Sequence, residues 1–418
     1  MINDSVLARK RIATRAPPRS TTTGALVIGG DYRGLGVVRS LGRRGIPVWV
    51  LTDDHLVAAT SRYAQRHVPW PEGDETRQVE YLLDLATRHQ LTGWAVFPTG
   101  DTAAAFLARH STELEGSFRL TVPPWEVMRW AYDKRLTDRL ATEVGVAYPR
   151  TYYPSGREEV AALDCAFPVI LKPAVKEQAN DFTRTKAWRV DDSQQLLAHY
   201  DLACTMVDPE VVMVQEIIPG NGETQVSYAA LCNDGRPLAW LTARRMRQYP
   251  VDFGRFSTCV ETTDLPEVEA LARRLIVAMG YTGLIEVEFK YDRRDGRYNL
   301  LDLNPRVWGW HTLAQRAGVD FPYLTWQMVL GEPVPEVSAQ SNIRWLRLAA
   351  DLPAAGIEMW RGHLSPLAYV RSIRRPVEFA FLAADDPLPA LLDIPLQFYR
   401  LWKRAAPKPV VIRDLPLA

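Results

Sequence analysis

The sequence predicts an α/β domain with a parallel sheet, followed by an α+β domain in which antiparallel strands are mixed with helices. The first domain is predicted from an apolar strand, Ala25–Ile28, that enters a glycine turn and precedes a helical stretch and a second strand, Val48–Leu51. This order of elements is a βαβ unit. The second domain is predicted from strands joined by short turns at residues 233–236 and 293–296, as in hairpins.

The domain limits are predicted from changes in composition along the 418 residues, a length that suits two or three domains. Residues 1–23 are rich in Arg, Thr and Pro without an apolar core, so we expect a disordered arm and no secretory signal. The first domain is predicted over residues 24–122. The second covers 123–334, in two subdomains that meet near 215–220, and 335–418 form a C-terminal extension without a clean period.

The individual elements follow in order along the chain. In the first domain we expect a helix at 78–89 and a strand at 94–97 after the initial βαβ unit. The second domain is expected to contain a charged helix at 125–144, strands at 169–171 and 211–218, a hairpin of 225–232 with 238–244, a helix at 266–279, and strands at 284–291 and 298–303.

Composition excludes several classes of protein. The 47% hydrophobic and 24% charged residues are those of a soluble globular protein, and the net charge of +1 gives no reason to expect nucleic acid. Four widely separated cysteines, without a CxxC pair, indicate reduced thiols in the cytoplasm. Because no run of about 18 apolar residues occurs, a spanning helix is not expected.

The segment 285–306 carries the strongest chemical signal. Strand alternation places Glu286 and Glu288 on one face, and Asp302 and Asn304 on one face of the next strand. A turn with an odd number of residues would set Glu288 opposite Asp302 and Glu286 opposite Asn304, whereas a two-residue Asp-Gly turn would separate them. Converging carboxylate and amide oxygens suit Mg²⁺. The alternative is a solvated strand face with alternating charges.

Two further segments point to a nucleotide. Lys172 ends an apolar strand, where a lysine is costly to bury unless an anion such as a phosphate faces it. The alternative is a lysine whose head reaches water at the end of the strand. Glu216 lies in the apolar strand Val-Gln-Glu-Ile-Ile, which stops at Pro219-Gly220 and would leave backbone groups exposed to an adenine edge.

In order and spacing, these segments and Arg306 resemble the ATP-grasp superfamily over roughly residues 24–330. Within it the chain is most similar to the carboxylate–amine ligases, the group similar to D-aspartate ligase. The resemblance implies a Rossmann-like pre-ATP-grasp domain, a two-subdomain ATP-grasp fold and a C-terminal extension. It also implies a cytoplasmic enzyme that uses ATP and Mg²⁺ to activate a carboxylate as an acyl phosphate for attack by an amine.

The resemblance also implies roles for single residues in nucleotide binding. Lys134 and Lys172 resemble the two nucleotide-binding lysines, of which the second contacts the α- and β-phosphates. Glu216 resembles the residue that recognises the exocyclic amine of adenine, and Ile218 the residue that recognises adenine through its backbone. Glu223 resembles the residue that holds the ribose hydroxyls.

Metal ligands and catalytic residues are implied in the same way. Glu288, Asp302 and Asn304 match the ligands of Mg²⁺, expected as two ions that Mn²⁺ could replace, although Asp302 stands where glutamate is more usual. Arg306 resembles the arginine that steadies the acyl phosphate or the substrate carboxylate. The remaining two catalytic candidates are predicted on one strand face toward the γ-phosphate: Arg245 and Arg247.

One departure from the family concerns the loop that normally closes over the phosphates. Residues 174–188 contain no glycine and instead carry Lys176, Arg184 and Lys186. Two alternatives are open: the loop closes over the phosphates through side-chain charge, or the activity of the enzyme is reduced.

A dehydrogenase that uses NAD(P) is the alternative suggested by the first domain. Gly29, Gly30 and Asp31 lie between strand and helix, but the spacing is neither GxGxxG nor a P-loop. We therefore assign this turn, with Asp101, to substrate binding. The alternative for all four residues is ordinary turn chemistry.

A non-catalytic ATP-binding sensor or scaffold is the third hypothesis. The extension carries Trp360, Trp402 and Lys403-Arg404 among prolines, and could contact a membrane surface or a partner, or cover the apolar surface of its own domain. The sequence does not identify the small-molecule carboxylate and amine, and a homodimer is merely the commonest assembly.

Overall fold

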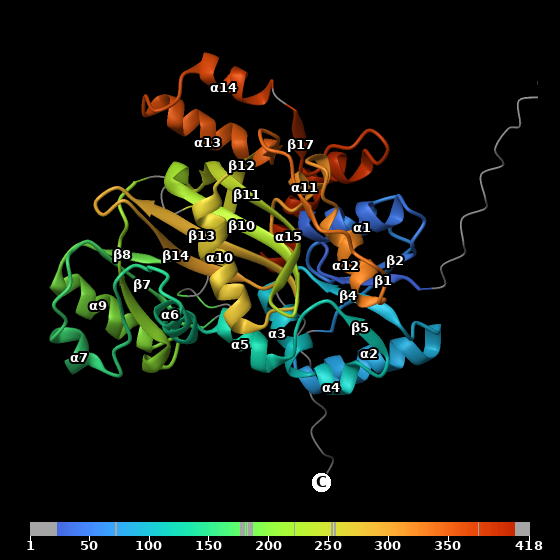
Figure 1. Ribbon diagram of the computed structural model, residues 1–418, viewed down its shortest axis with the longest axis horizontal. Helices are drawn as coiled ribbons and strands as arrows, with labels where there is room; N and C mark the ends of the chain where they lie inside the picture. Colours follow the sequence, from blue (N-terminus) through green and yellow to red (C-terminus); the bar gives the residue numbers. More distant parts are fainter. Residues whose placement is uncertain are drawn as a thin grey trace, which may run out of the picture.

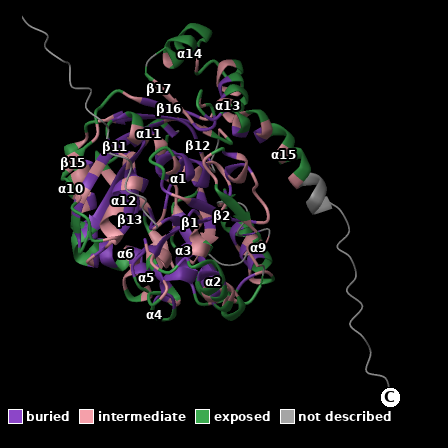
Figure 2. Ribbon diagram, turned by 90° about the vertical axis from the view of Figure 1, so that its right-hand side faces the viewer, coloured by how far each residue is buried: buried purple, intermediate pink, exposed green. Residues whose placement is uncertain are grey.

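The computed structural model describes residues 23–405, except 72, 176–179, 181, 183–186, 221, 252, 253, 255 and 375. The predicted arm, residues 1–23, lies almost entirely outside this part of the chain. Three sheets organise the described residues, and helices cover their faces (Figure 1). Buried positions concentrate in the strands and exposed positions in the outer helices (Figure 2).

The first sheet is parallel, as the sequence predicts, with five strands in the order β3-β2-β1-β4-β5. Its strands are β1 (Ala25–Ile28), β2 (Val48–Leu51), β3 (Arg66–Val68), β4 (Trp94–Pro98) and β5 (Phe118–Leu120). The connecting helices are α1 (Tyr32–Gly42), the short η1 (Ala58–Thr60), α2 (Glu75–His89), α3 (Asp101–Arg109) and α4 (Ser111–Leu114). From β1 the order runs to β2 on one side and to β4 on the other, and ligands bind at such switch points in open parallel sheets.

A predicted single helix at 125–144 is in fact two. α5 (Trp125–Tyr132) ends at Asp133, whose side chain accepts a hydrogen bond from the backbone of Arg135 at 2.9 Å and begins α6 (Lys134–Glu143). Aspartate is a favoured N-cap, so the break follows from local chemistry. Lys134 is thereby placed in the first turn of a helix.

The second sheet is small and antiparallel, in the order β6-β9-β7-β8. Its strands are β6 (Thr151–Tyr152), β7 (Val169–Pro173), β8 (Trp188–Val190) and β9 (Val212–Glu216). The helices are α7 (Arg157–Ala161), α9 (Ser193–Cys204) and η2 (Pro209–Val211). The sheet has its own apolar core, which includes Val169, Leu171 and Val214.

The third sheet has eight strands, ordered β14-β13-β10-β11-β12-β16-β17, with β15 paired to β11. β10 (Gln225–Asn233) and β11 (Arg236–Tyr249) form the predicted hairpin, whose Asp234 and Gly235 both have positive φ, as a type I′ turn requires. The other long strands are β12 (Phe256–Thr263), β13 (Gly283–Asp292) and β14 (Arg297–Asn304). Its helices and short turn are η3 (Gly222–Thr224), α10 (Pro266–Met279), α11 (Thr312–Arg316) and α12 (Phe321–Val329).

The extension after residue 335 is more regular than its sequence suggests. It adds three short strands, β15 (Val337–Ser338), β16 (Arg344–Leu346) and β17 (Val377–Phe379), to the third sheet, and three helices, α13 (Leu348–Trp360), α14 (Pro366–Ile373) and α15 (Leu388–Ala405). Strands of two or three residues are too short for a detectable period. Within the described residues, no helix combines the length and apolar character needed to cross a membrane.

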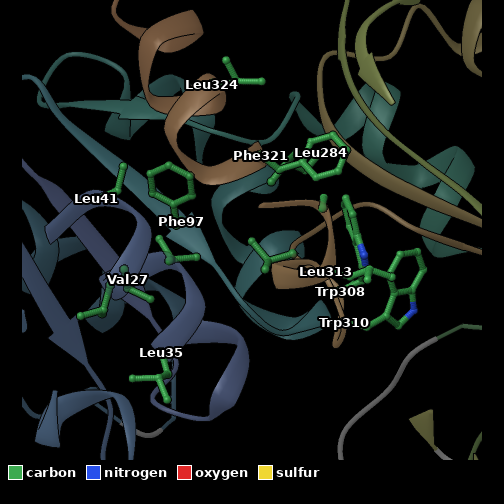
Figure 3. Packing of buried hydrophobic residues seen from close by; sticks show 14 of the residues in the cluster. Val27, Leu35, Leu41, Phe97, Leu284, Trp308, Trp310, Leu313, Phe321 and Leu324 are labelled. Atoms are coloured by element: carbon green, nitrogen blue, oxygen red, sulfur yellow. The ribbon is translucent and has the colours of Figure 1, made fainter. Parts of the chain in front are cut away.

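One apolar core joins the first and third sheets. Val27 and Phe97 of the first sheet belong to the same buried cluster as Leu284 on β13 and Trp308 and Phe321 beyond β14 (Figure 3). Because close-packed interiors move as units, this core fixes the carboxyl ends of β1 and β4 relative to the end of β14. The candidate site lies at that junction.

Candidate functional site

β13 and β14 carry four polar side chains on one face of the third sheet. Their register pairs Glu286 with Asn304 and Glu288 with Asp302, which confirms the predicted pairing. The predicted odd-numbered turn is wrong, because the two strands are joined by four turn residues, 293–296. A four-residue turn alone would have placed the acids on opposite faces.

A β-bulge restores the pairing. The register shifts after Glu288, so Phe289 pairs with Leu300 and Leu301 is the extra residue. One extra residue reverses the alternation beyond it, which returns Asp302 to the face of Glu288. Leu300, rather than Leu301, therefore joins Phe289 in the apolar core behind the strands.

Glu286 is buried and is bound by neutral groups. It accepts hydrogen bonds from Ser227 Oγ at 3.1 Å and from Asn304 Nδ2 at 3.2 Å. Burial, followed by the charge of Glu288, raises the pKa of Glu286 to about 8. A carboxyl with such a pKa is protonated at neutral pH, and a cation bound beside it would favour its charged form.

Glu288, the adjacent buried acid, has both neutral and charged neighbours. Its Oε1 accepts from Asn304 Nδ2 at 3.1 Å, and its Oε2 accepts from Gln225 Nε2. The guanidinium of Arg245 lies 3.6 Å from Oε2. Gln225 and Ser227 were not among the predicted site residues, although their alternation along β10 was a detectable signal for side chains on this face.

Lys134, at the start of α6, contacts this polar face. Its Nζ donates to Asp302 Oδ1 at 2.6 Å, and both side chains are mostly buried. The structure thus brings together one predicted nucleotide-binding lysine and one predicted metal ligand. With Asp302 turned to Lys134, no group of three or more His, Cys, Asp or Glu side chains in the described part of the chain is arranged to hold a metal ion.

Arg306 links the polar face to the first sheet. Its guanidinium donates to both carboxylate oxygens of Asp101, at 2.9 and 3.1 Å, and to Asn304 Oδ1 at 3.0 Å. Asp101 begins α3, directly after β4. Arg306, predicted for catalysis, and Asp101, predicted for substrate binding, therefore form a bidentate ion pair at the switch point of the parallel sheet.

The glycine turn after β1 is held by close packing. Gly29 has φ +115°, and a Cβ there would collide with the Thr99 hydroxyl, while a Cβ on Gly30 would collide with the carbonyl of His55. Asp31 caps α1 by accepting from the backbone of Arg33 at 2.9 Å, and it also binds the Arg33 guanidinium. These contacts account for the three residues as turn chemistry, and their role toward substrate stays a prediction.

Lys172 lies on β7 of the second sheet and faces polar neighbours. Its Nζ donates to Gln215 Oε1 at 2.9 Å, and Gln215 donates to Thr151 Oγ1 at 2.8 Å. Burial raises the pKa of Asp138, although the charges of Lys172 and Lys134 oppose that rise. Asp138, four residues after Lys134 on α6, therefore lies near both predicted lysines. The sequence analysis missed it despite this i, i+4 spacing.

The predicted adenine-binding residues lie at the end of β9. Glu216 is the last residue of this strand, near the Tyr152 hydroxyl at 3.4 Å. The carbonyl oxygens of Ile218 and Gly220 each accept a hydrogen bond from Lys290 Nζ at 2.8 Å. Lys290, two residues after Glu288, thus holds the chain that crosses from the second sheet to the third.

The predicted pairing of Arg245 with Arg247 on one face is wrong. A β-bulge between them pairs Arg245 with Val260 and Arg247 with Cys259, so the two arginines point to opposite faces. Arg245 lies beside Glu288. Arg247 forms a buried ion pair with Asp351 of α13, in which Nε lies 2.8 Å from Oδ1 and Nη2 lies 2.7 Å from Oδ2. Its side chain therefore points away from the polar face.

Glu223 lines a cavity of about 360 Å³ between β11 and the extension. It is exposed, next to Gly222 in the short turn before β10. His363, Ala368 and Ser372 of the extension also line the cavity. Lys176, Arg184 and Lys186, which the sequence suggests for closure over phosphates, lie outside the described residues.

The segment that carries the polar face is similar to proteins of known family. A family described as ATP-grasp in the biosynthetic pathway with Ter operon matches residues 208–349, which contain the polar face and Arg306. The curated D-aspartate ligase of Enterococcus faecium is 24% identical over 54% of this chain and 57% of its own length. Residues 208–349 therefore match an ATP-grasp family.

Solved structures support the ATP-grasp fold over most of the chain. The biotin carboxylase domain of a 2-oxoglutarate carboxylase from Hydrogenobacter thermophilus, solved with MgADP and bicarbonate, has a TM-score of 0.61 and 15% identity, covering 77% of this chain and 73% of that one. An L-amino acid ligase from Bacillus licheniformis has a TM-score of 0.58 and 17% identity, covering 74% of each chain.

The chain spans only part of its curated relatives. It covers little more than half of the D-aspartate ligase and 4% of acetyl-CoA carboxylase 2 of Oryza sativa, which is 32% identical over 100 residues. None of the relatives described above is a dehydrogenase, so the NAD(P) alternative has no support from them.

Proposed function

We propose that this ATP-grasp protein is an ATP- and Mg²⁺-dependent ligase that joins a small-molecule carboxylate to an amine. The observation that carries the proposal is the polar face of β13 and β14, where Glu286, Glu288, Asp302 and Asn304 share one side of the sheet. Lys134 and Arg306 border this face and bring positive charge to it. The ligases among its relatives have the same reaction class.

The donor set suits magnesium. Carboxylate and amide oxygens are the ligands that Mg²⁺ prefers. Burial and the charge of Glu288 raise the pKa of Glu286, although the charges of Arg306 and Arg245 oppose that rise. We assign the metal to Glu288, Asp302 and Asn304, with two ions expected and Mn²⁺ as a substitute. When bound, the metal would neutralise charge on the phosphates of ATP.

The remaining residues bind and orient the substrates. In the first step an oxygen of the substrate carboxylate attacks the γ-phosphorus of ATP, forming an acyl phosphate and releasing ADP. In the second step the amine attacks the acyl carbon, phosphate leaves, and the amide forms with loss of a proton. Such chemistry requires mainly positioning and charge neutralisation, which we assign to Lys134, Lys172, Arg245 and Arg306.

Binding of the nucleotide base and sugar is assigned to the connection between the second and third sheets. Glu216 and Ile218 would bind adenine, and Glu223 the ribose. The substrate carboxylate is assigned to the switch point of the first sheet, with Asp101, Gly29, Gly30 and Asp31 at its edge. We withdraw Arg247 from the catalytic set because Asp351 already holds it.

The division of the chain and its surroundings belong to the same proposal. We propose a pre-ATP-grasp domain at 24–122, an ATP-grasp domain at 123–334 and an extension at 335–418. The four free thiols agree with a cytoplasmic location, and the dimeric biotin carboxylase relative is the reason to test for a homodimer.

The proposal is tested by thermal unfolding with Mg·ATP, with ATP plus chelator, and with NADPH. A ligand at about 100 times its dissociation constant stabilises the folded state by about 2.7 kcal/mol, which is a shift of several degrees. We expect a shift with Mg·ATP that shrinks on chelation, and ADP release when pools of carboxylates and amines are added. A shift without ADP release would indicate a sensor, and a shift with NADPH alone a dehydrogenase.

A further inference from the structure

Helix α15 presents an apolar face to solvent. Leu391, Ile394 and Phe398 are 71%, 56% and 69% exposed, and their spacing of three and four residues places them on one side of the helix. Leu388 and Tyr399 are also exposed and widen the same face. Figure 2 shows α15 at the margin of the molecule.

The opposite side of α15 meets the protein through apolar and polar groups, with Ala390 and Leu396 packed against the core shared by the first and third sheets. Asp393 is buried and accepts from Gln397 Nε2 at 3.0 Å. Arg400 donates to Asp54, after β2, with an Nε–Oδ1 distance of 2.6 Å. An ordinary surface helix packs its apolar side on the core and turns its polar side to water. α15 departs from this arrangement: Ala390 and Leu396 pack on the core, but Leu391, Ile394 and Phe398 face water on another side.

Exposed apolar side chains also mark the other helices of the extension. Trp360, at the end of α13, is 87% exposed, and Leu367, Val370 and Ile373 are exposed on α14. On α10, by contrast, Val277 is the large apolar side chain that is exposed among the residues described. Single exposed apolar residues are normal, but a concentration of them marks an interaction surface.

The charges of α13, α14 and α15 favour an anionic partner. The carboxylates of this region are buried or bound to the protein: Asp351 to Arg247, Glu358 to His363, Asp385 to Arg43, and Asp386 to Arg39, with Glu378 and Asp393 at least partly buried. Arg371 and Arg374, at the end of α14, are exposed. In sequence, α15 continues into Lys403 and Arg404.

We propose that α15 is a peripheral membrane anchor that binds the surface of an anionic bilayer. Leu391, Ile394 and Phe398 enter the boundary between headgroups and acyl chains, and the exposed Arg371 and Arg374 of α14 attract the anionic headgroups. A helix with a strong apolar face, aromatic side chains and basic flanks is of the kind that lies in the plane of the interface. The face is distinct from the polar face of β13 and β14, so the anchor does not depend on the proposed ligase activity.

Flotation of the whole protein with vesicles tests the anchor. We expect binding to vesicles of phosphatidylcholine with phosphatidylserine, little binding to phosphatidylcholine alone, and a loss of binding as salt is raised. The double variant Ile394→Glu, Phe398→Glu should weaken binding at least about tenfold, since each side chain loses its apolar burial. Val277→Glu on α10 is the matched control and should bind like the unmodified protein.

Several results would overturn the anchor. Equal binding to both kinds of vesicle, or unchanged binding by the double variant, would remove the assignment to anionic lipid. A dimer in light scattering that the double variant loses, without vesicle binding, would make the face a contact between two copies. Circular dichroism and the Mg·ATP thermal shift should be the same in all variants, because the substituted side chains are exposed and outside the nucleotide site.

Discussion

Two buried carboxyl groups in this molecule, those of Asp386 and Glu286, have opposite kinds of hydrogen-bond partner. Asp386, before α15, accepts from Arg39 Nε at 2.9 Å, from Ser61 Oγ at 2.7 Å and from the backbone of Arg62 at 3.0 Å. Glu286, equally buried on β13, accepts from a serine and an amide, and no ion pair joins it to a cation in the described part of the chain. The difference separates a charged carboxylate that holds two segments together from a carboxyl whose pKa burial raises to about 8.

The largest effect is expected at Asp386. Asp386→Ala should leave Arg39 buried without its partner and lower the free energy of unfolding by about 3–5 kcal/mol. Urea unfolding at neutral pH measures this. A loss of less than about 1 kcal/mol in the free energy of unfolding would mean that this ion pair does not stabilise the contact between the extension and α1.

A loss of activity without a loss of stability is expected at Glu288. Glu288→Gln should lower Mg²⁺-dependent ATP turnover at least about 10²-fold, because even residues behind metal ligands contribute 10–100-fold. ADP release measures turnover, and urea unfolding should show an intact fold. Asp385→Asn, a change to an exposed carboxylate paired with Arg43, is the control and should retain turnover; unchanged turnover in Glu288→Gln would remove the metal assignment.

The protonation of Glu286 should make the stability of the folded protein depend on pH. Its pKa is raised to about 8 in the folded protein, from the usual 4.5, so the folded state binds the proton more tightly than the unfolded state. Its contribution to stability is therefore complete below about pH 4.5 and is lost as pH rises through about 8. With chelator present, Glu286→Gln should gain stability over the unmodified protein between about pH 5 and pH 8.

Magnesium provides the second half of that experiment. A cation bound at the polar face would favour the charged form of Glu286, so Mg²⁺ should flatten the decline in stability of the unmodified protein with rising pH. The same decline with and without Mg²⁺ would speak against metal binding beside Glu286.

The smallest effect is expected at the residue next to Asp386. Asp385 pairs with Arg43 and accepts from the Tyr63 hydroxyl, but its side chain is 43% exposed. Asp385→Ala should cost only about 0.2–1 kcal/mol in urea unfolding, since water and salt screen such pairs. A loss as large as that of Asp386→Ala would show that burial does not separate the two neighbours.

The pairing of Glu288 with Asp302 was predictable, but the reason for it was not. Alternation along each strand predicts which of its residues share a face. Two registers of β13 against β14 are then possible, and only one brings the four polar side chains to the same face. The sequence suggested an odd turn, whereas the chain uses a four-residue turn and a bulge at Leu301. Bulges are set by how both strands pack against their neighbours, which a single strand does not reveal.

Arg247 shows the limit of reading a strand by itself. From sequence it shares a face with Arg245, yet a bulge turns it to Asp351, 104 residues later in the chain. Similarly, the extension reads as irregular but supplies three strands of the third sheet. Contacts between distant segments depend on packing of the whole chain, which local periodicity does not encode.

Local sequence was enough to predict the first βαβ unit, the hairpin of β10 with β11, and the polar alternation on β13 and β14. These depend on residues within a few positions of one another, where side-chain period and backbone preference act directly. Only the tertiary structure decided that Arg306 meets Asp101, that Lys134 meets Asp302 and that α15 turns its apolar face outward. Each of these joins or exposes surfaces that lie far apart in sequence, and their free energy comes from burial and charge pairing in the assembled molecule.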